Sequence, residues 1–204
     1  MEVLVLGIGN VLWADEGFGV RAVEALNEAY EFPEGVELVD GGTQGLHLLD
    51  QVCSARRLVL FDAVDYRMPP GFLKVARDAA VPAWGATKMS MHQSGFQELL
   101  ALAELKGNTP ERMTLIGVQP ENLSDFGGSL RPCVRARVPD AVALAVQELE
   151  AWGFTPTLRA TQPPRLNAAP LSIDTYEAER PTPEEACRIG DARFLDIRAR
   201  AGVR

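Results

Sequence analysis

Apolar and polar positions follow two alternating patterns along the first 150 residues of the chain. Short runs that are apolar nearly throughout, or rich in β-formers between turn residues, predict strands at residues 2–8, 36–39, 57–62, 72–75 and 113–118. The segments between them predict helices at residues 20–28, 45–53, 96–107 and 139–152. This alternation predicts a three-layer α/β domain built on a mostly parallel sheet.

The carboxyl ends of the predicted strands are the expected place for chemistry. Open α/β sheets bind their ligands outside those ends, where the connecting loops gather. The residues in question are Gly9, Asp40, Asp62 and Gln119.

The pattern changes beyond Trp152. Residues 155–170 are rich in Pro, Thr, Arg and Ala without periodicity, which is typical of a linker. A Thr-Pro-Glu-Glu sequence at 182–185 resembles a helix start, and Phe194 and Ile197 could dock a short terminal helix. We therefore divide the chain into a domain at 1–154 and an extension of unknown role at 155–204.

Composition narrows the classes of function. The 204 residues are 47% hydrophobic and 24% charged, with a net charge of −8, so a phosphate-backbone ligand is a poor fit and no nucleic-acid partner is expected. Three scattered cysteines favour a reducing compartment. The N-terminal apolar run is too short to span a bilayer and has no basic leader, so we expect a cytoplasmic protein without membrane contact.

Scarce histidine excludes several mechanisms. His47 and His92 are the two histidines of the chain, which rules out a three-histidine zinc site within one copy. The HExxH, GxSxG and Walker motifs are all absent from the sequence. His47 is best explained as a structural residue on a helix face.

Gly7 and Gly9 resemble the opening of a dinucleotide fingerprint, with Asp40 where a ribose-binding acid would lie. Leu12, however, occupies the third glycine position. Asp15 and Glu16 would also repel a pyrophosphate from the helix N-terminus. A nucleotide-binding enzyme is therefore the weaker interpretation, and no nucleotide is expected.

Glu16, Asp62 and His92 form a second candidate set. Glu16 follows the first strand, Asp62 ends the third, and His92 is expected in an irregular loop, residues 78–91 and just beyond, before the next helix. Two carboxylates and one imidazole suit Ni²⁺, Zn²⁺ or a similar ion and leave coordination positions open. Taken alone, such acids are more often caps or surface groups, and a lone histidine is more often structural.

Five segments, in order and at matching spacing, resemble the hydrogenase maturation endopeptidases over about the first 150 residues. They are LGIGNVLWADEGFGV at 6–20, VDGGTQG at 39–45, LVLFDAVD at 58–65, MSMHQSGF at 89–96 and LIGVQPEN at 115–122. The resemblance implies a phosphorylase/hydrolase-like fold, a twisted sheet with helices on both faces. It implies an endopeptidase, aspartyl-type or metal-dependent, that removes the C-terminal extension of a nickel–iron hydrogenase large-subunit precursor after nickel insertion.

In that family Glu16, Asp62 and His92 match the metal ligands, so the resemblance implies that they grip nickel carried by the substrate and take part in catalysis. Three protein ligands hold a metal weakly, so we expect low nickel occupancy in the free enzyme. The resemblance also suggests a substrate-binding role for one loop: Asp40, Gly41, Gly42, Thr43, Gln44 and Gly45. A non-catalytic nickel-binding chaperone with the same three ligands is the alternative.

Overall fold

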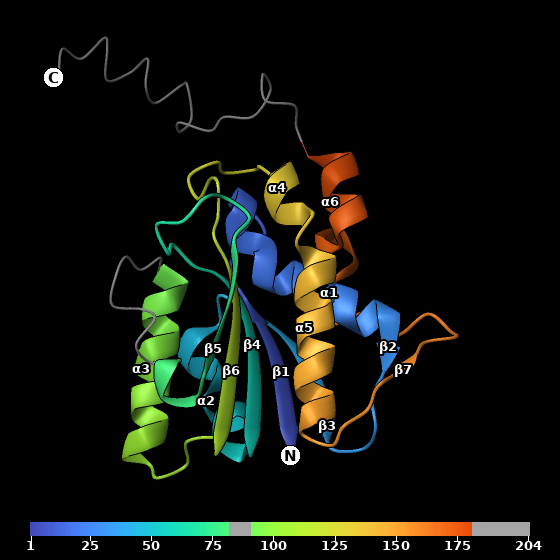
Figure 1. The fold of residues 1–204 in the computed structure, drawn as a ribbon. Helices are drawn as coiled ribbons and strands as arrows, with labels where there is room; N and C mark the ends of the chain where they lie inside the picture. Colours follow the sequence, from blue (N-terminus) through green and yellow to red (C-terminus); the bar gives the residue numbers. More distant parts are fainter. Residues whose placement is uncertain (82–90, 181–204) are drawn as a thin grey trace, which may run out of the picture.

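The computed structural model describes residues 1–81 and 91–180, with side chains described for residues 1–81 and 96–180. Its centre is a five-stranded sheet in the order β3-β1-β4-β6-β5 (Figure 1). The strands are β1 (Val3–Ile8), β3 (Val36–Gly42), β4 (Arg57–Ala63), β5 (Leu73–Arg77) and β6 (Arg112–Val118). Neighbours pair in parallel except β5, which runs antiparallel to β6 at one edge.

Helices cover both faces of this sheet (Figure 1). On one face lie α1 (Phe18–Ala29) and α5 (Val138–Ala151), and on the other α2 (Leu49–Ser54) and α3 (Met91–Leu105). Alternation along β1 divides the core: Val3 and Val5 join the cluster under α1 and α5, whereas Leu4 and Leu6 join the cluster under α2 and α3. The predicted three-layer α/β architecture is confirmed.

Shorter elements complete the described chain. They are η1 (Ala14–Gly17), β2 (Tyr30–Glu31), η2 (Gly45–Leu48), η3 (Asp78–Ala80), α4 (Pro132–Arg135), β7 (Thr157–Leu158), η5 (Ala169–Leu171) and α6 (Ile173–Glu179). β2 and β7 pair as a small antiparallel ribbon beside α1.

Close packing of α1 against the sheet depends on Gly19. A Cβ atom there would lie 2.2 Å from the carbonyl oxygen of Ile8 and 2.3 Å from that of Phe61. Any side chain would therefore push the helix away from both β1 and β4. With glycine in place, the start of α1 lies directly over the carboxyl ends of these two strands.

Several boundaries differ from the sequence-based expectation. The helix expected from residue 96 starts at Met91, so His92 lies in the first turn of α3 and the expectation of a loop there is wrong. Within residues 155–180, which were interpreted as linker and extension, the structure has β7, η5 and α6 packed on the domain. The proposed helix start at 182–185, Phe194 and Ile197 lie outside the described residues.

Among the described residues, no helix combines the length and the apolar character that crossing a membrane requires.

Candidate active site at the switch between β1 and β4

The order of the strands reverses between β1 and β4. From β1 the chain crosses to β3 on one side and then returns to β4 on the other. Loops leaving neighbouring strands in opposite directions open a crevice at their carboxyl ends, which is where such sheets bind ligands. The candidate site residues are therefore expected near the carboxyl ends of β1 and β4.

Glu16 lies on η1, the single turn of 3-10 helix between β1 and α1. Its side chain is half-buried, and its backbone lies against Gly9 at the end of β1. The turn η1 also contacts β4. Glu16 is therefore held near the carboxyl ends of β1 and β4 by contacts of η1 with both strands.

Asp62 lies near the carboxyl end of β4 and is fully buried. Its Oδ1 accepts a hydrogen bond from the backbone N–H of Ala63 at 2.8 Å. A carboxylate without solvent is costly unless charged or polar partners surround it, and buried carboxylates at strand ends are candidates for a functional site. The structure thus places Asp62 on β4 and Glu16 on η1, the turn that follows β1, so both follow or end a strand that flanks the switch point.

His92 lies in the first turn of α3, and its side chain is outside the described residues. The helix packs against η2 and α2, on the side of the sheet opposite α1. Among the side chains that the structure describes, no three His, Cys, Asp or Glu groups are placed together to hold a metal. The three-ligand set therefore remains a prediction, with Asp62 placed by β4, Glu16 by η1 and His92 by α3.

The predicted substrate loop begins at the end of β3, the strand at the other edge of the sheet from β5. Asp40 Oδ1 accepts from the Gly42 N–H at 2.9 Å, and its backbone oxygen accepts from Gln44 Nε2 at 3.1 Å. The Gly42 carbonyl in turn accepts from the Gly9 N–H at 2.9 Å, across a register shift between β1 and β3. The loop is thereby fixed beside the crevice, with Thr43 and Gln44 exposed.

Asp15 has a role that the sequence did not reveal. Its carboxylate is fully buried and accepts three backbone N–H groups: from Glu121 at 2.9 Å, from Asn122 at 2.8 Å and from Arg131 at 2.7 Å. This carboxylate thereby holds the two ends of the loop that follows β6. Spacing along the chain gives no signal for it, because its partners lie more than a hundred residues away.

Gln119 organises the loop after β4 in a similar way. Its Oε1 accepts from the Tyr66 N–H at 2.7 Å and from the Met68 N–H at 3.2 Å, and its Nε2 donates to Asp65 at 3.2 Å. The Tyr66 hydroxyl is buried, and among the described residues it has no hydrogen-bond partner. Burial, followed by the charge of Asp62, raises the pKa of Tyr66, so this hydroxyl stays protonated near the candidate site.

An apolar rim borders Glu16. Trp13 and Phe126 pack with ring centroids 5.3 Å apart, and their segments are joined by a hydrogen bond from the Gly127 N–H to the Leu12 carbonyl at 2.8 Å. Leu12 and Phe126 are both exposed. Exposed apolar side chains next to a charged crevice fit contact with a polypeptide better than contact with a small ion.

Comparisons with known proteins find one family of relatives. A sequence model of the hydrogenase maturation protease family matches residues 20–148. The hydrogenase expression/formation protein HoxM of Cupriavidus necator is 54% identical over 197 residues, covering 95% of this chain and 98% of its own. HupD of Rhodobacter capsulatus, of the same description, is 55% identical over 200 residues, covering 98% of this chain and 95% of its own.

A solved structure is similar as well. The hydrogenase maturating endopeptidase HybD from E. coli superimposes with a TM-score of 0.75 at 38% identity, covering 78% of this chain and 99% of its own. Its sheet and helices correspond to the architecture described above, and the predicted fold class is confirmed on this second ground.

Proposed function

Because the chain belongs to the hydrogenase maturation protease family, we propose that it cuts the C-terminal extension from the large-subunit precursor of a nickel–iron hydrogenase after nickel has been inserted. The observation that supports this most is the convergence of Glu16 and Asp62 on the crevice between β1 and β4. Both are carboxylates; Asp62 lies at the end of β4 and is fully buried, and Glu16 lies on the turn η1 that follows β1.

Nickel is part of the substrate in this proposal. A carboxylate pair completed by the imidazole of His92 would grip the ion and leave positions for groups of the precursor. A divalent ion held there can polarise a carbonyl or lower the pKa of a bound water. The residues of this chain then have one task, which is to bring the peptide bond to the ion in a fixed orientation.

The peptide itself would lie along the loop Asp40–Gly45. This loop ends an edge strand, and edge strands bind extended peptides through their backbone groups. The apolar rim of Leu12, Trp13 and Phe126 borders the other side of Glu16 and would contact the folded body of the precursor. Charge, backbone and apolar contacts together match a polypeptide substrate.

The test is cleavage of a nickel-loaded large-subunit precursor by the wild type and by Glu16→Gln, Asp62→Asn and His92→Ala. Matched controls are His47→Ala and Asp50→Asn, which change an exposed histidine and a carboxylate that is 96% exposed. We expect each of the three site variants to lose cleavage by at least a hundredfold while the controls keep it. A nickel-free precursor should stay uncut by every variant.

Thermal unfolding of each variant separates lost chemistry from lost folding. Normal cutting by the three site variants would show that these side chains are structural and that the active site lies elsewhere. A wild type that binds the loaded precursor but never cuts it would replace the protease by a nickel-binding chaperone.

A further inference from the structure

The described end of the chain folds back over α1. We name residues 159–179 the strap. Its first residue, Arg159, donates from Nε to the Asn27 carbonyl at 2.9 Å, and Asn27 Nδ2 donates to the Pro164 carbonyl at 3.0 Å. Further along, Arg21 Nη1 donates to the Leu171 carbonyl at 2.5 Å. The strap therefore follows the helix whose first turn lies over the candidate site.

The last turn of the strap holds the loop after β6. Glu177 accepts from Ser129 Oγ at 2.5 Å and from Arg135 Nη2 at 3.0 Å, and the Tyr176 hydroxyl donates to the Gly128 carbonyl at 3.0 Å. Burial alone would raise the pKa of Glu177, but these two hydrogen bonds and the charge of Arg135 outweigh it and keep that pKa below its ordinary value. The strap thus connects α1 to the loop after β6, which also carries Phe126 of the apolar rim.

Asn167 connects the strap to Asp40, the first residue of the predicted substrate loop. Its Nδ2 donates to Asp40 Oδ2 at 2.9 Å and also to Glu24 Oε1 on α1. An amide nitrogen carries two hydrogens, so one group satisfies both carboxylates. Glu24 is held in turn by Arg21 at 2.9 Å, and that guanidinium is almost fully buried.

Both carboxylate oxygens of Asp40 are therefore used to fix its position. Oδ1 accepts from the Gly42 N–H within the loop, and Oδ2 accepts from the strap. Removing Asn167 would leave Oδ2 without this donor and close to the charge of Glu24. The conformation of Asp40, and with it the start of the Gly-rich loop, depends on a residue 127 positions later in the chain.

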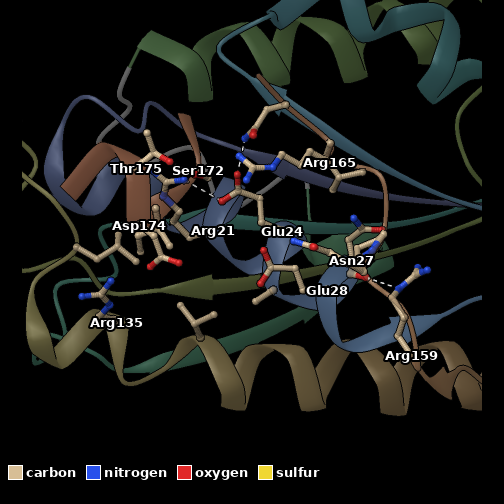
Figure 2. Close-up of a pocket in the computed structure, with 18 of the residues that line it drawn as sticks. Arg21, Glu24, Asn27, Glu28, Arg135, Arg159, Arg165, Ser172, Asp174 and Thr175 are labelled. Atoms are coloured by element: carbon tan, nitrogen blue, oxygen red, sulfur yellow. Dashed lines mark hydrogen bonds and ion pairs between the residues drawn. The ribbon is translucent and has the colours of Figure 1, made fainter. Parts of the chain in front are cut away.

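The strap encloses a space against the body of the domain. A cavity of about 650 Å³ lies between the strap, α1 and the start of α5, lined by polar groups such as Arg21, Glu24, Arg135 and Asp174 (Figure 2). Leu166 of the strap packs against the core under α1 and α5, and the polar contacts just described hold the strap elsewhere.

We propose that the strap is a specificity element of the enzyme, in which Asn167 is a positioning residue that holds Asp40 and its loop in the shape that receives the substrate peptide. This inference rests on the proposed function. The sequence match to the protease family ends at residue 148, before the strap begins. HoxM and HupD match this chain over 95% and 98% of its length, strap included, whereas the E. coli hydrogenase 2 maturation protease matches 75% of it. A segment that only part of the family shares, and that fixes a loop of the common domain, is well placed to adapt that loop to the precursors of its own group.

Three variants of the full-length chain test the proposal. Asn167→Ala removes both donors, and Asn167→Asp replaces the donor by a third carboxylate. Asn27→Ala is the matched control, because it removes a strap hydrogen bond that does not touch Asp40. The readouts are KM and kcat for cleavage of nickel-loaded precursor, and hydrogen exchange of the amides at residues 41–45.

For Asn167→Ala we expect a rise of about tenfold in KM with kcat within about twofold of wild type, and exchange at Gly42 about tenfold faster. Asn167→Asp should raise KM further, because it adds repulsion to the lost hydrogen bonds. Asn27→Ala should leave KM and the exchange at Gly42 within about twofold of wild type.

Unchanged KM and unchanged exchange in Asn167→Ala would overturn the proposal. Equal effects from Asn167→Ala and Asn27→Ala would overturn it too, since they would show general loss of stability. If the wild type does not cut the precursor, the proposed function fails, and the exchange measurement alone still decides whether Asn167 orders the loop.

Discussion

The backbone of Gly9 touches the backbone of Glu16: a Cβ atom on Gly9 would lie 1.8 Å from the Glu16 carbonyl oxygen. Gly9 also has a φ of +134°, which side-chain-bearing residues rarely adopt. The first candidate ligand is therefore positioned by the absence of a side chain seven residues earlier. The second glycine of the GIGN sequence, Gly9, therefore helps to set the position of Glu16.

Gly9→Ala should displace η1 and with it the Glu16 carboxylate. We expect cleavage of the loaded precursor to fall roughly a hundredfold, because an ångström of displacement at a reacting group has an effect of that size. The measurement is the initial rate of cleavage, with melting temperature followed in parallel. Gly107→Ala is the control, since Gly107 also has a positive φ of +69° but a Cβ there would meet nothing within 4 Å. Equal losses in the two variants would contradict the assignment.

Asp15→Asn should destabilise the whole protein. The substituted amide presents hydrogens to at least one of the three backbone N–H groups that now donate to the carboxylate. We expect the free energy of unfolding to fall by about 2–4 kcal/mol, the range for lost charged hydrogen bonds in a buried place. Urea denaturation measures it. Asp140→Asn changes an exposed carboxylate on α5 and should stay within about 0.5 kcal/mol of wild type.

Tyr66→Phe should raise the free energy of unfolding by about 1 kcal/mol, because the buried hydroxyl has no partner among the described residues. Tyr176→Phe gives the opposite sign, since that hydroxyl donates to the Gly128 carbonyl. Denaturant titration of both variants checks the pair. A Tyr66→Phe variant that is less stable than wild type would mean that the hydroxyl does bond, and a loss of cleavage at unchanged stability would mean that it meets the substrate.

Glu24 should make stability depend on pH in a defined direction. Burial raises the pKa of Glu24 above 4.5, and the charge of Arg21 and the hydrogen bonds from Arg21 and Asn167 only partly offset it. The folded state then binds the proton more tightly than the unfolded state. The contribution to stability is present below pH 4.5 and is lost as the pH rises through the raised pKa.

The measurement is the unfolding free energy of wild type minus that of Glu24→Gln, taken from pH 7 to pH 4. This difference should increase as the pH falls and level off below the ordinary pKa of the carboxyl group. A difference that decreases on acidification would show that the ion pair with Arg21, not burial, dominates at this position.

Much of the architecture follows from local pattern. The strands β1, β4 and β6 are buried on both faces, so their sequences are apolar nearly throughout, and their limits were predicted within one residue. β2 and β7 have two residues each, and only their mutual pairing makes them strands. Such short elements have no periodicity that a sequence could reveal.

For the candidate site, the sequence predicts which residues follow or end a strand, because the sheet topology determines where those positions lie. Glu16 was expected in the loop after the first strand and Asp62 at the end of the third, and a parallel sheet brings such positions to one edge. Asp15 and Asn167 were not found, because their partners lie more than a hundred residues away in sequence. The start of α3 was also missed, since the residues before Phe96 have no apolar stripe to mark a helix.

The hydrogen bond between Asn167 and Asp40 also implies an order of folding steps during synthesis. At ordinary rates of synthesis, the 127 residues between them take on the order of ten seconds to be added. During that interval the sheet and its first helices can fold while the loop at Asp40 still lacks its partner. The proposed task of this protein is to process the C-terminal end of another protein. Its own loop at Asp40 likewise takes its final form only after the C-terminal part of the chain, with Asn167, has been made.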